Sequence, residues 1–177
     1  VGCGSSDDWC NGASRRDGSC LMKAGDLVDH IIRRSDVSQR FIIAIAGPPG
    51  AGKSTLSEQL VTMLKARSRH SRIISMDGFH LENSTLKRLG LFDKKGSPTT
   101  FDVPAFIQVM KRLAAYESDV AIPMFDRKKD ITIENASIVS TQDKILIVEG
   151  NYLLLNDKQW VELQDIWDET VFINPGM

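Results

Sequence analysis

The sequence predicts an α/β protein with a mostly parallel sheet, and two observations support this class. Short, β-branched apolar runs of strand length alternate along the chain with longer segments in which apolar residues recur every three or four positions. A helix between two strands joins them in parallel through a right-handed crossover. The length of 177 residues leaves room for one domain with a proper core. We therefore expect a single domain over residues 23–177, preceded by a flexible leader over residues 1–22.

The predicted leader is rich in Gly, Ser, Asp and Asn and has too few apolar groups to offset the entropy of ordering it. It contains Cys3, Cys10 and Cys20, whose spacing lacks the C-x-x-C pair of a structural zinc site. A leader without metal is therefore favoured over a metal-binding one. Because the chain starts with Val1 instead of Met, we expect it to be a fragment, with a removed presequence left open.

The elements of the domain are predicted in chain order. Apolar residues at helical spacing predict a helix over residues 24–34, and the continuous apolar run Phe41–Ala46 predicts a strand buried on both faces. Leucines that recur every four residues from Leu56 predict a helix over 53–67. Further strands are predicted at 72–76, 120–124, 145–148 and 171–173, and a further helix at 104–116.

A phosphate-binding loop is predicted at the run Gly47-Pro48-Pro49-Gly50-Ala51-Gly52-Lys53-Ser54, between a strand and a helix. Its glycines let successive backbone N–H groups turn toward phosphate oxygens, and the helix presents its positive dipole end to the same anion. We expect Lys53 to contact the β- and γ-phosphates, Ser54 to bind Mg²⁺ and Thr55 to contact the α-phosphate. The expected ligand is ATP with magnesium, since a purely structural glycine turn does not need Lys53-Ser54 in this register.

Two carboxylates, Asp77 and Glu149, directly follow predicted strands, and each precedes a glycine that leaves room for a ligand. Ligands of open α/β sheets lie at this edge, and phosphoryl transfer needs one group to deprotonate the acceptor and others to hold magnesium. We assign Asp77 as the base and Glu149 to the magnesium shell; exchanged or shared roles stay open. A lone aspartate at the end of a strand is more typical of a helix cap or turn, but two carboxylates beside this loop favour a functional role.

Four ordered segments resemble the P-loop kinases related to uridine kinase and pantothenate kinase, in particular nucleoside or fructose-transport kinases. They are Met76-Asp77-Gly78-Phe79-His80, Gly96-Ser97-Pro98-Thr99-Thr100-Phe101-Asp102, Pro123-Met124-Phe125-Asp126-Arg127 and Glu149-Gly150-Asn151-Tyr152-Leu153-Leu154-Leu155. The resemblance implies a three-layer P-loop NTPase fold with a five-stranded parallel core. It also implies an ATP-dependent kinase that phosphorylates a hydroxyl of a small metabolite. The family label favours a nucleoside such as uridine, with pantothenate or a sugar left open.

Residue roles carried over by the resemblance make Asp77 the base. They place His80, Asp102 and Arg127 facing the acceptor and Tyr152 near it. His80 is equally typical of a structural histidine. Arg127 is also typical of the charged run Arg127-Lys128-Lys129, but its place directly after a predicted strand favours the functional role. The neighbouring pair Lys94-Lys95 is interpreted as solvated surface.

The kinases that this chain resembles continue past the last predicted strand with a lid, so we expect a form truncated before the lid, with weak nucleotide binding, low activity and possible self-association. A nucleotide-driven switch and a nucleotide-binding module without catalysis are the rival functions. The net charge of −1 gives no field that would recruit nucleic acid or a membrane. No apolar run approaches the roughly 18 residues of a membrane span. We expect a soluble, cytoplasmic protein, with an organelle left open.

Overall fold

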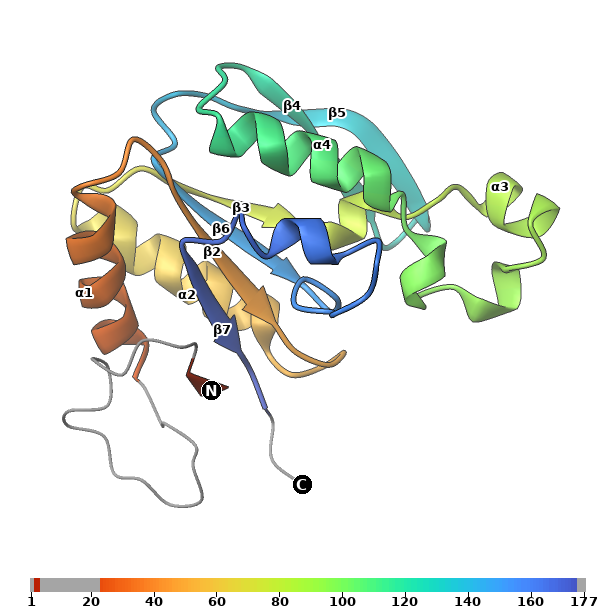
Figure 1. The fold of residues 1–177 in the computed structure, drawn as a ribbon, viewed down its shortest axis with the longest axis horizontal. Coiled ribbons are helices and arrows are strands. Elements are labelled where there is room, and N and C mark those ends of the chain that lie inside the picture. Colours follow the sequence, from red (N-terminus) through yellow and green to blue (C-terminus); the bar gives the residue numbers. More distant parts are fainter. Residues whose placement is uncertain (1, 4–22, 175–177) are drawn as a thin grey trace. The chain divides into compact units, whose positions relative to one another are not determined.

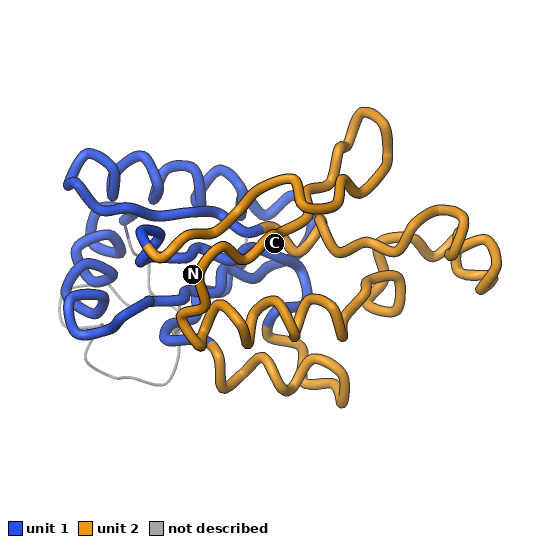
Figure 2. The backbone as a smooth tube through the Cα atoms, turned by 90° about the horizontal axis from the view of Figure 1, so that it is seen from above, with its two compact units in different colours: residues 1–74, 142–153, 167–177 blue, residues 75–141, 154–166 orange. Residues whose placement is uncertain are grey.

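The structure, a computed structural model, describes residues 2–3 and 23–174 of the chain. The predicted leader, with Cys10 and Cys20, lies outside the described residues except for Gly2–Cys3. The described chain forms two compact units, which Figure 2 colours separately. The first comprises residues 1–74, 142–153 and 167–177, and the second comprises residues 75–141 and 154–166. The chain of the second unit is thus inserted into that of the first at two places.

A five-stranded sheet forms the centre of the first unit, in the order β1 (Gly2–Cys3), β7 (Glu169–Phe172), β2 (Phe41–Ala46), β6 (Ile145–Gly150) and β3 (Ser71–Ser75). Strand β2 runs parallel to both β6 and β7, and Figure 1 shows it between them. This confirms the mostly parallel sheet. Strand β1 pairs with β7 in the antiparallel direction and was not predicted.

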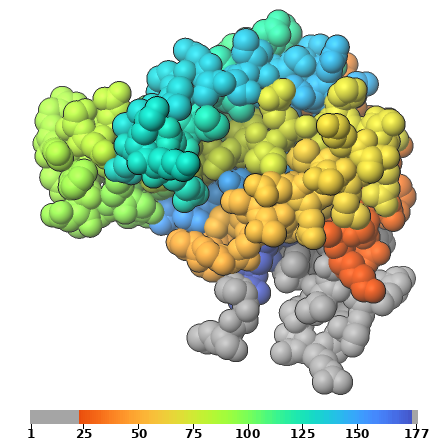
Figure 3. Space-filling model, turned by 180° about the vertical axis from the view of Figure 1, so that it is seen from behind, coloured from red at the N-terminus to blue at the C-terminus, as the bar shows by residue number. Residues whose placement is uncertain are grey.

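Two helices, α1 (Ala24–Ser35) and α2 (Lys53–Ala66), pack against one face of this sheet. Alternate residues of a strand share a face, so Phe41, Ile43 and Ile45 of β2 lie in one buried cluster with apolar side chains of both helices. All six residues of β2 are buried, as predicted for a central parallel strand. The outer side of α2 forms part of the molecular surface, where its orange and yellow atoms are exposed in Figure 3.

The second unit contains an antiparallel hairpin where the sequence analysis placed a strand of the parallel sheet. Residues 120–124 do form a strand, β4 (Val120–Asp126), but it pairs with the unpredicted β5 (Ile131–Val139), so its assignment to the parallel sheet was wrong. The carboxylate of Asp126 fixes the turn, because its Oδ1 accepts hydrogen bonds from the backbone N–H groups of Lys128 (2.9 Å) and Lys129 (3.1 Å). The charged run after β4 is therefore a hairpin turn.

Helix α4 (Val103–Ala114) contributes five buried apolar side chains to the core of the second unit. Its buried apolar stripe includes Phe106, whose ring lies 4.9 Å from that of Phe79 and 6.3 Å from that of Trp160. Asp102 caps the helix, since its Oδ1 accepts the N–H of Ala105 at 3.0 Å. The second unit also contains short helical segments: η2 (Met76–Phe79), α3 (Asn83–Arg88), η3 (Phe92–Lys94), η4 (Pro98–Thr100) and η5 (Val161–Leu163). None of the helices in the described chain has the length and apolar character needed to span a bilayer.

Gly78 serves packing within the second unit, a role that the sequence analysis did not predict. It is buried in η2, and a Cβ added there would lie 2.6 Å from the carbonyl oxygen of Pro123 in β4. Contacts this short do not occur for real Cβ atoms, and the opposing atoms are backbone. Only glycine allows η2 to approach the hairpin so closely.

Gly78→Ala is expected to lower the free energy of unfolding by about 2–3 kcal/mol, because the added methyl group forces two backbone segments apart. For a chain of this size that corresponds to a fall in Tm of roughly 5–10 °C in a thermal unfolding experiment. Gly25→Ala in α1 is the matched control, since its Cβ would meet only Met63 Cε at an ordinary 3.7 Å. Helix propensity makes the control neutral or stabilising. An unchanged Tm for Gly78→Ala would contradict this packing role.

Candidate active site

The phosphate-loop run connects β2 to α2 within the first unit. Gly47 lies against the residue that follows β7, since a Cβ added there would come 2.7 Å from the carbonyl oxygen of Ile173. Gly50 and Gly52 have φ values of 76° and 89°, a region that disfavours side chains, and a Cβ added at either would meet no atom within 4 Å. The loop therefore needs its glycines for backbone conformation and leaves open space beside two of them.

The ammonium group of Lys53 folds back over this loop. Its Nζ donates hydrogen bonds to the carbonyl oxygens of Gly47 (3.0 Å) and Pro48 (2.9 Å). No side chain caps the start of α2, where Gly52 is the N-cap. Ser54 and Thr55 are exposed in the first turn. A positive side chain and an uncapped helix start on one exposed loop form a site suited to an anion.

The two predicted magnesium ligands contact each other. Ser54 Oγ donates a 2.8 Å hydrogen bond to Glu149 Oε2. Glu149 lies inside β6, paired in register with Ile45, rather than just after the strand as predicted, and it is 7% exposed. A hydroxyl and a carboxylate are hard oxygen donors of the kind magnesium takes. Among the described residues no three His, Cys, Asp or Glu side chains gather to hold a metal ion, so this pair would need phosphate oxygens and water to complete a magnesium shell.

Asp77 occupies the second position of η2 in the second unit; β3 ends at Ser75, one residue earlier than predicted, so Met76 separates Asp77 from the strand. Its N–H bonds to Ser75 Oγ at 3.3 Å, which fixes the start of the turn. Its Oδ2 forms an ion pair with Nη2 of Arg127, the residue after β4, at 2.5 Å. The Asp77 side chain is 23% exposed and that of Arg127 is 74% exposed. The structure therefore places the predicted base, Asp77, in contact with Arg127, one of the residues predicted to face the phosphate acceptor.

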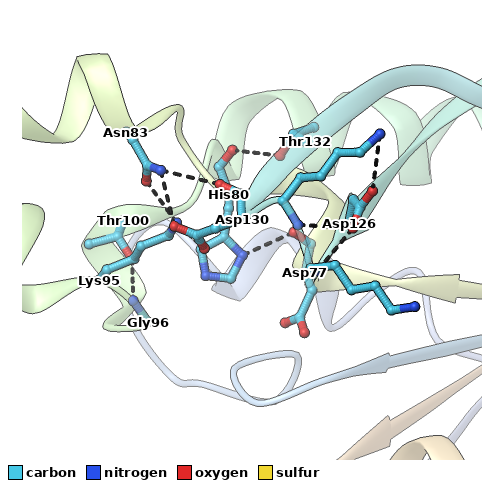
Figure 4. A network of polar contacts seen from close by, with 11 residues as sticks. Asp77, His80, Asn83, Lys95, Gly96, Thr100, Asp126, Asp130 and Thr132 are labelled. Carbon is cyan, nitrogen blue, oxygen red and sulfur yellow. Dashed lines mark hydrogen bonds and ion pairs between the residues drawn. The ribbon is translucent and has the colours of Figure 1, made fainter.

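His80 is held in place by several contacts within the second unit. Its Nδ1 lies 2.9 Å from the backbone oxygen of Asp77, and its carbonyl accepts a 3.2 Å bond from Thr132 Oγ1 (Figure 4). Its ring packs against Phe101 and Phe125, with centroids 4.0 Å and 5.0 Å away. Because a carbonyl only accepts, Nδ1 must carry the proton, and Nε2 of the neutral ring is then an acceptor.

Lys95 is not solvated surface, which corrects the sequence interpretation of this residue. Its Nζ donates hydrogen bonds of 2.7 Å to both Asn83 Oδ1 and Asp130 Oδ1 (Figure 4). The same nitrogen lies 5.3 Å from the centre of the Phe125 ring, and the Lys95 side chain is only 20% exposed. Asn83 Nδ2 also donates to Asp130 Oδ2 at 3.0 Å. The hydrogen bond from Lys95, followed by that from Asn83, lowers the pKa of the Asp130 carboxyl. This network ties α3 and the end of η3 to the hairpin turn.

A cavity of about 440 Å³ lies within the second unit, and His80 and Asp102 both line it. Asp102 thus combines its helix-capping contact with a position at this cavity. Tyr152, two residues beyond β6 in the first unit, is partly buried. Its role stays a prediction.

A family model for the phosphoribulokinase/uridine kinase family matches residues 42–176. The chain belongs to this family. The match covers the phosphate loop, Asp77, the hairpin and Glu149, and it confirms the resemblance drawn from the four ordered motifs.

Relatives of this phosphoribulokinase/uridine kinase family member are found among curated sequences and solved structures. The uncharacterised Escherichia coli (strain K12) protein YggC is 36% identical over 138 residues, which cover 77% of this chain and 56% of YggC. A pantothenate kinase of Halalkalibacterium halodurans is 34% identical over 141 residues, covering 76% of this chain and 45% of the kinase. The chain therefore spans about half the length of these curated relatives.

A crystal structure from Silicibacter sp. TM1040, provisionally named a fructose transport system kinase, superposes with a TM-score of 0.80. Its sequence is 38% identical, and the alignment covers 85% of this chain and 74% of that one. The likeness confirms the predicted fold class, a P-loop α/β fold with a mostly parallel sheet.

Sequence reasoning missed several polar residues near His80 because their signal depends on the hairpin. Asn83 and Asp130 look like isolated surface residues until the β4–β5 turn brings Asp130 to Lys95. Glu134 and Asn135 line the cavity from a strand that was not predicted. An early sign was available in the alternating apolar residues Ile131, Ile133 and, after an interruption, Ile138, which are typical of one strand with an irregularity.

Proposed function

We propose that this chain carries the nucleotide-binding and catalytic residues of an ATP-dependent kinase that phosphorylates a hydroxyl group of a small metabolite. The main support is the hydrogen bond between Ser54 Oγ and Glu149 Oε2 at the head of the phosphate loop. Membership of a kinase family supports the same reaction class.

In this proposal the loop residues Gly47 to Thr55 bind the triphosphate. Lys53 exchanges the carbonyls of Gly47 and Pro48 for phosphate oxygens. Ser54 and Glu149 hold magnesium, directly or through water. The bound ion supplies positive charge that offsets the charge of the transferring phosphoryl group.

Asp77 is the proposed general base. Arg127 contacts Oδ2, which leaves Oδ1 to accept the proton of the acceptor hydroxyl. The ion pair restrains the carboxylate, so we assign Arg127 a positioning role beside its predicted contact with the acceptor. His80 and Asp102 line a cavity in the same unit and are proposed to bind the acceptor.

The names of relatives mention uridine, pantothenate and a fructose transport system. A nucleoside such as uridine is our first choice, and a sugar is the alternative that shares its hydroxyl-rich chemistry. A nucleotide-driven switch and a binding module without catalysis remain rival functions.

The test measures ATP consumption with magnesium in the presence of single hydroxyl compounds, after a thermal-shift screen for compounds that raise the Tm. A kinase consumes ATP in proportion to an added acceptor and forms its phosphate ester. A switch consumes ATP at the same rate without any acceptor, and a binding module gains stability from the nucleotide yet consumes none. Either of the last two outcomes contradicts the kinase proposal.

A further inference from the structure

We infer that the cavity in the second unit selects a neutral or positively charged, hydroxyl-rich acceptor and discriminates against acceptors that carry a carboxylate or phosphate. This inference rests on the proposed kinase function and names the substrate class of its acceptor site. The evidence for it is the set of side chains that line the cavity. The set includes Glu82, Glu134 and Asn135, to which the family resemblance assigned no role.

The cavity has three walls, all from the second unit. One face of α4 forms the first wall, with Asp102, Ala105, Val109 and Arg112 at helical spacing. The hairpin forms the second, and the segment from Gly78 to Glu82 forms the third. A volume of about 440 Å³ lies in the range of small-molecule sites, roughly 300–1,000 Å³.

An irregularity in the hairpin provides the polar groups of the second wall. Ile122 pairs with Ser137 and Met124 pairs with Ile133, so Pro123 alone stands opposite residues 134–136. Proline has no N–H to donate to the strand ladder, which favours such an interruption. Asn135 there has a φ of 50°, a conformation that asparagine tolerates better than most residues. Both Glu134 and Asn135 from this bulge line the cavity.

Most polar side chains of the lining are hydrogen-bond acceptors. Glu82, Asp102 and Glu134 present carboxylates, which when ionised only accept. In its neutral form His80 adds another acceptor at Nε2, because its Nδ1–H is committed to the backbone oxygen of Asp77. A complementary ligand is therefore rich in donors, as hydroxyl and ammonium groups are.

The charges of the residues in and near the lining favour the same kind of ligand. Arg112 is the strong cation of the lining, and Glu117 engages it through two hydrogen bonds of 2.9 Å and 2.5 Å. The nearby Lys95 is engaged by Asn83 and Asp130, and Arg127 by Asp77. Three carboxylate residues thus line the cavity, while each of these cations already has an anionic partner. An anionic acceptor would meet repulsion that a polyol or an amino sugar does not.

Equilibrium binding to the whole chain tests this inference with compounds of matched size. D-glucosamine, D-glucose and D-glucuronate share a pyranose ring and differ in charge; uridine and pantothenate extend the comparison to a neutral and an anionic acceptor. Titration calorimetry is expected to give D-glucosamine an affinity at least about tenfold above that of D-glucuronate, with D-glucose between them, and uridine an affinity above that of pantothenate. Replacing both Glu82 and Glu134 by glutamine should reduce the tenfold ratio to about threefold or less. Glu58→Gln on the exposed side of α2 is the matched control and should leave the ratio unchanged.

Equal or reversed affinities for D-glucosamine and D-glucuronate overturn the inference. So does a ratio that survives the double substitution, or the absence of binding by D-glucose, D-glucosamine and uridine to protein that still binds the magnesium complex of an ATP analogue. Binding of that analogue is measured on the same preparation. If the ATP analogue does not bind while the charge discrimination persists, the nucleotide site of the proposed function is contradicted and the inference about the cavity is not. Failure of the proposed function and failure of this inference are therefore distinguishable.

Discussion

Replacing Lys53 by alanine is expected to weaken binding of a magnesium–ATP analogue by about a hundredfold or more. The substitution deletes the ammonium group that the loop holds at Gly47 and Pro48, and each charged hydrogen bond to phosphate contributes about 1.5–3 kcal/mol. The fold should survive, since the loop keeps its glycines and the core of α2 is untouched. Titration calorimetry measures the affinity, and circular dichroism with thermal unfolding checks the fold.

Lys65→Ala provides the matched control for this experiment. Lys65 is an exposed lysine in the last turn of the same helix, so its loss changes net charge equally without touching the loop. Its affinity for the analogue should stay within twofold of the parent chain. A folded Lys53→Ala protein that binds as tightly as the parent would remove the basis of the triphosphate site.

Asp77→Asn is expected to lower phosphoryl transfer by about a hundredfold or more while nucleotide affinity hardly changes. Asparagine keeps the size of the side chain and a hydrogen-bonding oxygen for Arg127, but it cannot take the proton of the acceptor. The measurement is the initial rate of phosphate-ester formation, in protein that transfers phosphate before substitution and with the acceptor found by screening.

Two further variants serve as comparisons for Asp77→Asn. Asp93→Asn removes an exposed carboxylate elsewhere in the second unit and should leave the rate unchanged. Glu149→Gln should raise the magnesium concentration needed for half the maximal rate, because it removes the charge of the proposed metal ligand. If Asp77→Asn stays within a few-fold of the parent while Glu149→Gln nearly abolishes transfer, the assignment of the base to Asp77 is wrong.

The parallel sheet could be predicted from sequence because its strands carry their own signal. The run Phe41–Ala46 is apolar throughout, which is the pattern of a parallel strand buried on both faces. The hairpin could not be predicted in the same way. Its second strand is largely exposed and is interrupted at residues 134–136, so neither a continuous apolar run nor a clean alternation marks it.

The phosphate loop was predictable because local sequence determines its conformation, with glycine where φ is positive and lysine and serine at the helix start. The contacts of Lys95 and Gly78 were not, since they join segments far apart in sequence. Lys95 meets Asp130 only after the hairpin turn has formed, and Gly78 meets Pro123 across the same hairpin. In the sequence alone, side chains whose role depends on such pairings resemble ordinary surface or turn residues.

The pairing of β2 with β6 has a consequence for the order of folding. Phe41 faces Ile145, more than a hundred residues later, whereas the β4–β5 hairpin closes between Asp126 and Ile131. Closing the longer loop costs roughly 2–3 kcal/mol more chain entropy, so the hairpin and helices form early and the sheet late. Ser54 likewise meets Glu149 across 95 residues. During synthesis the phosphate loop therefore leaves the ribosome long before the carboxylate of Glu149, and the pair proposed to hold magnesium forms only in the last stage of folding.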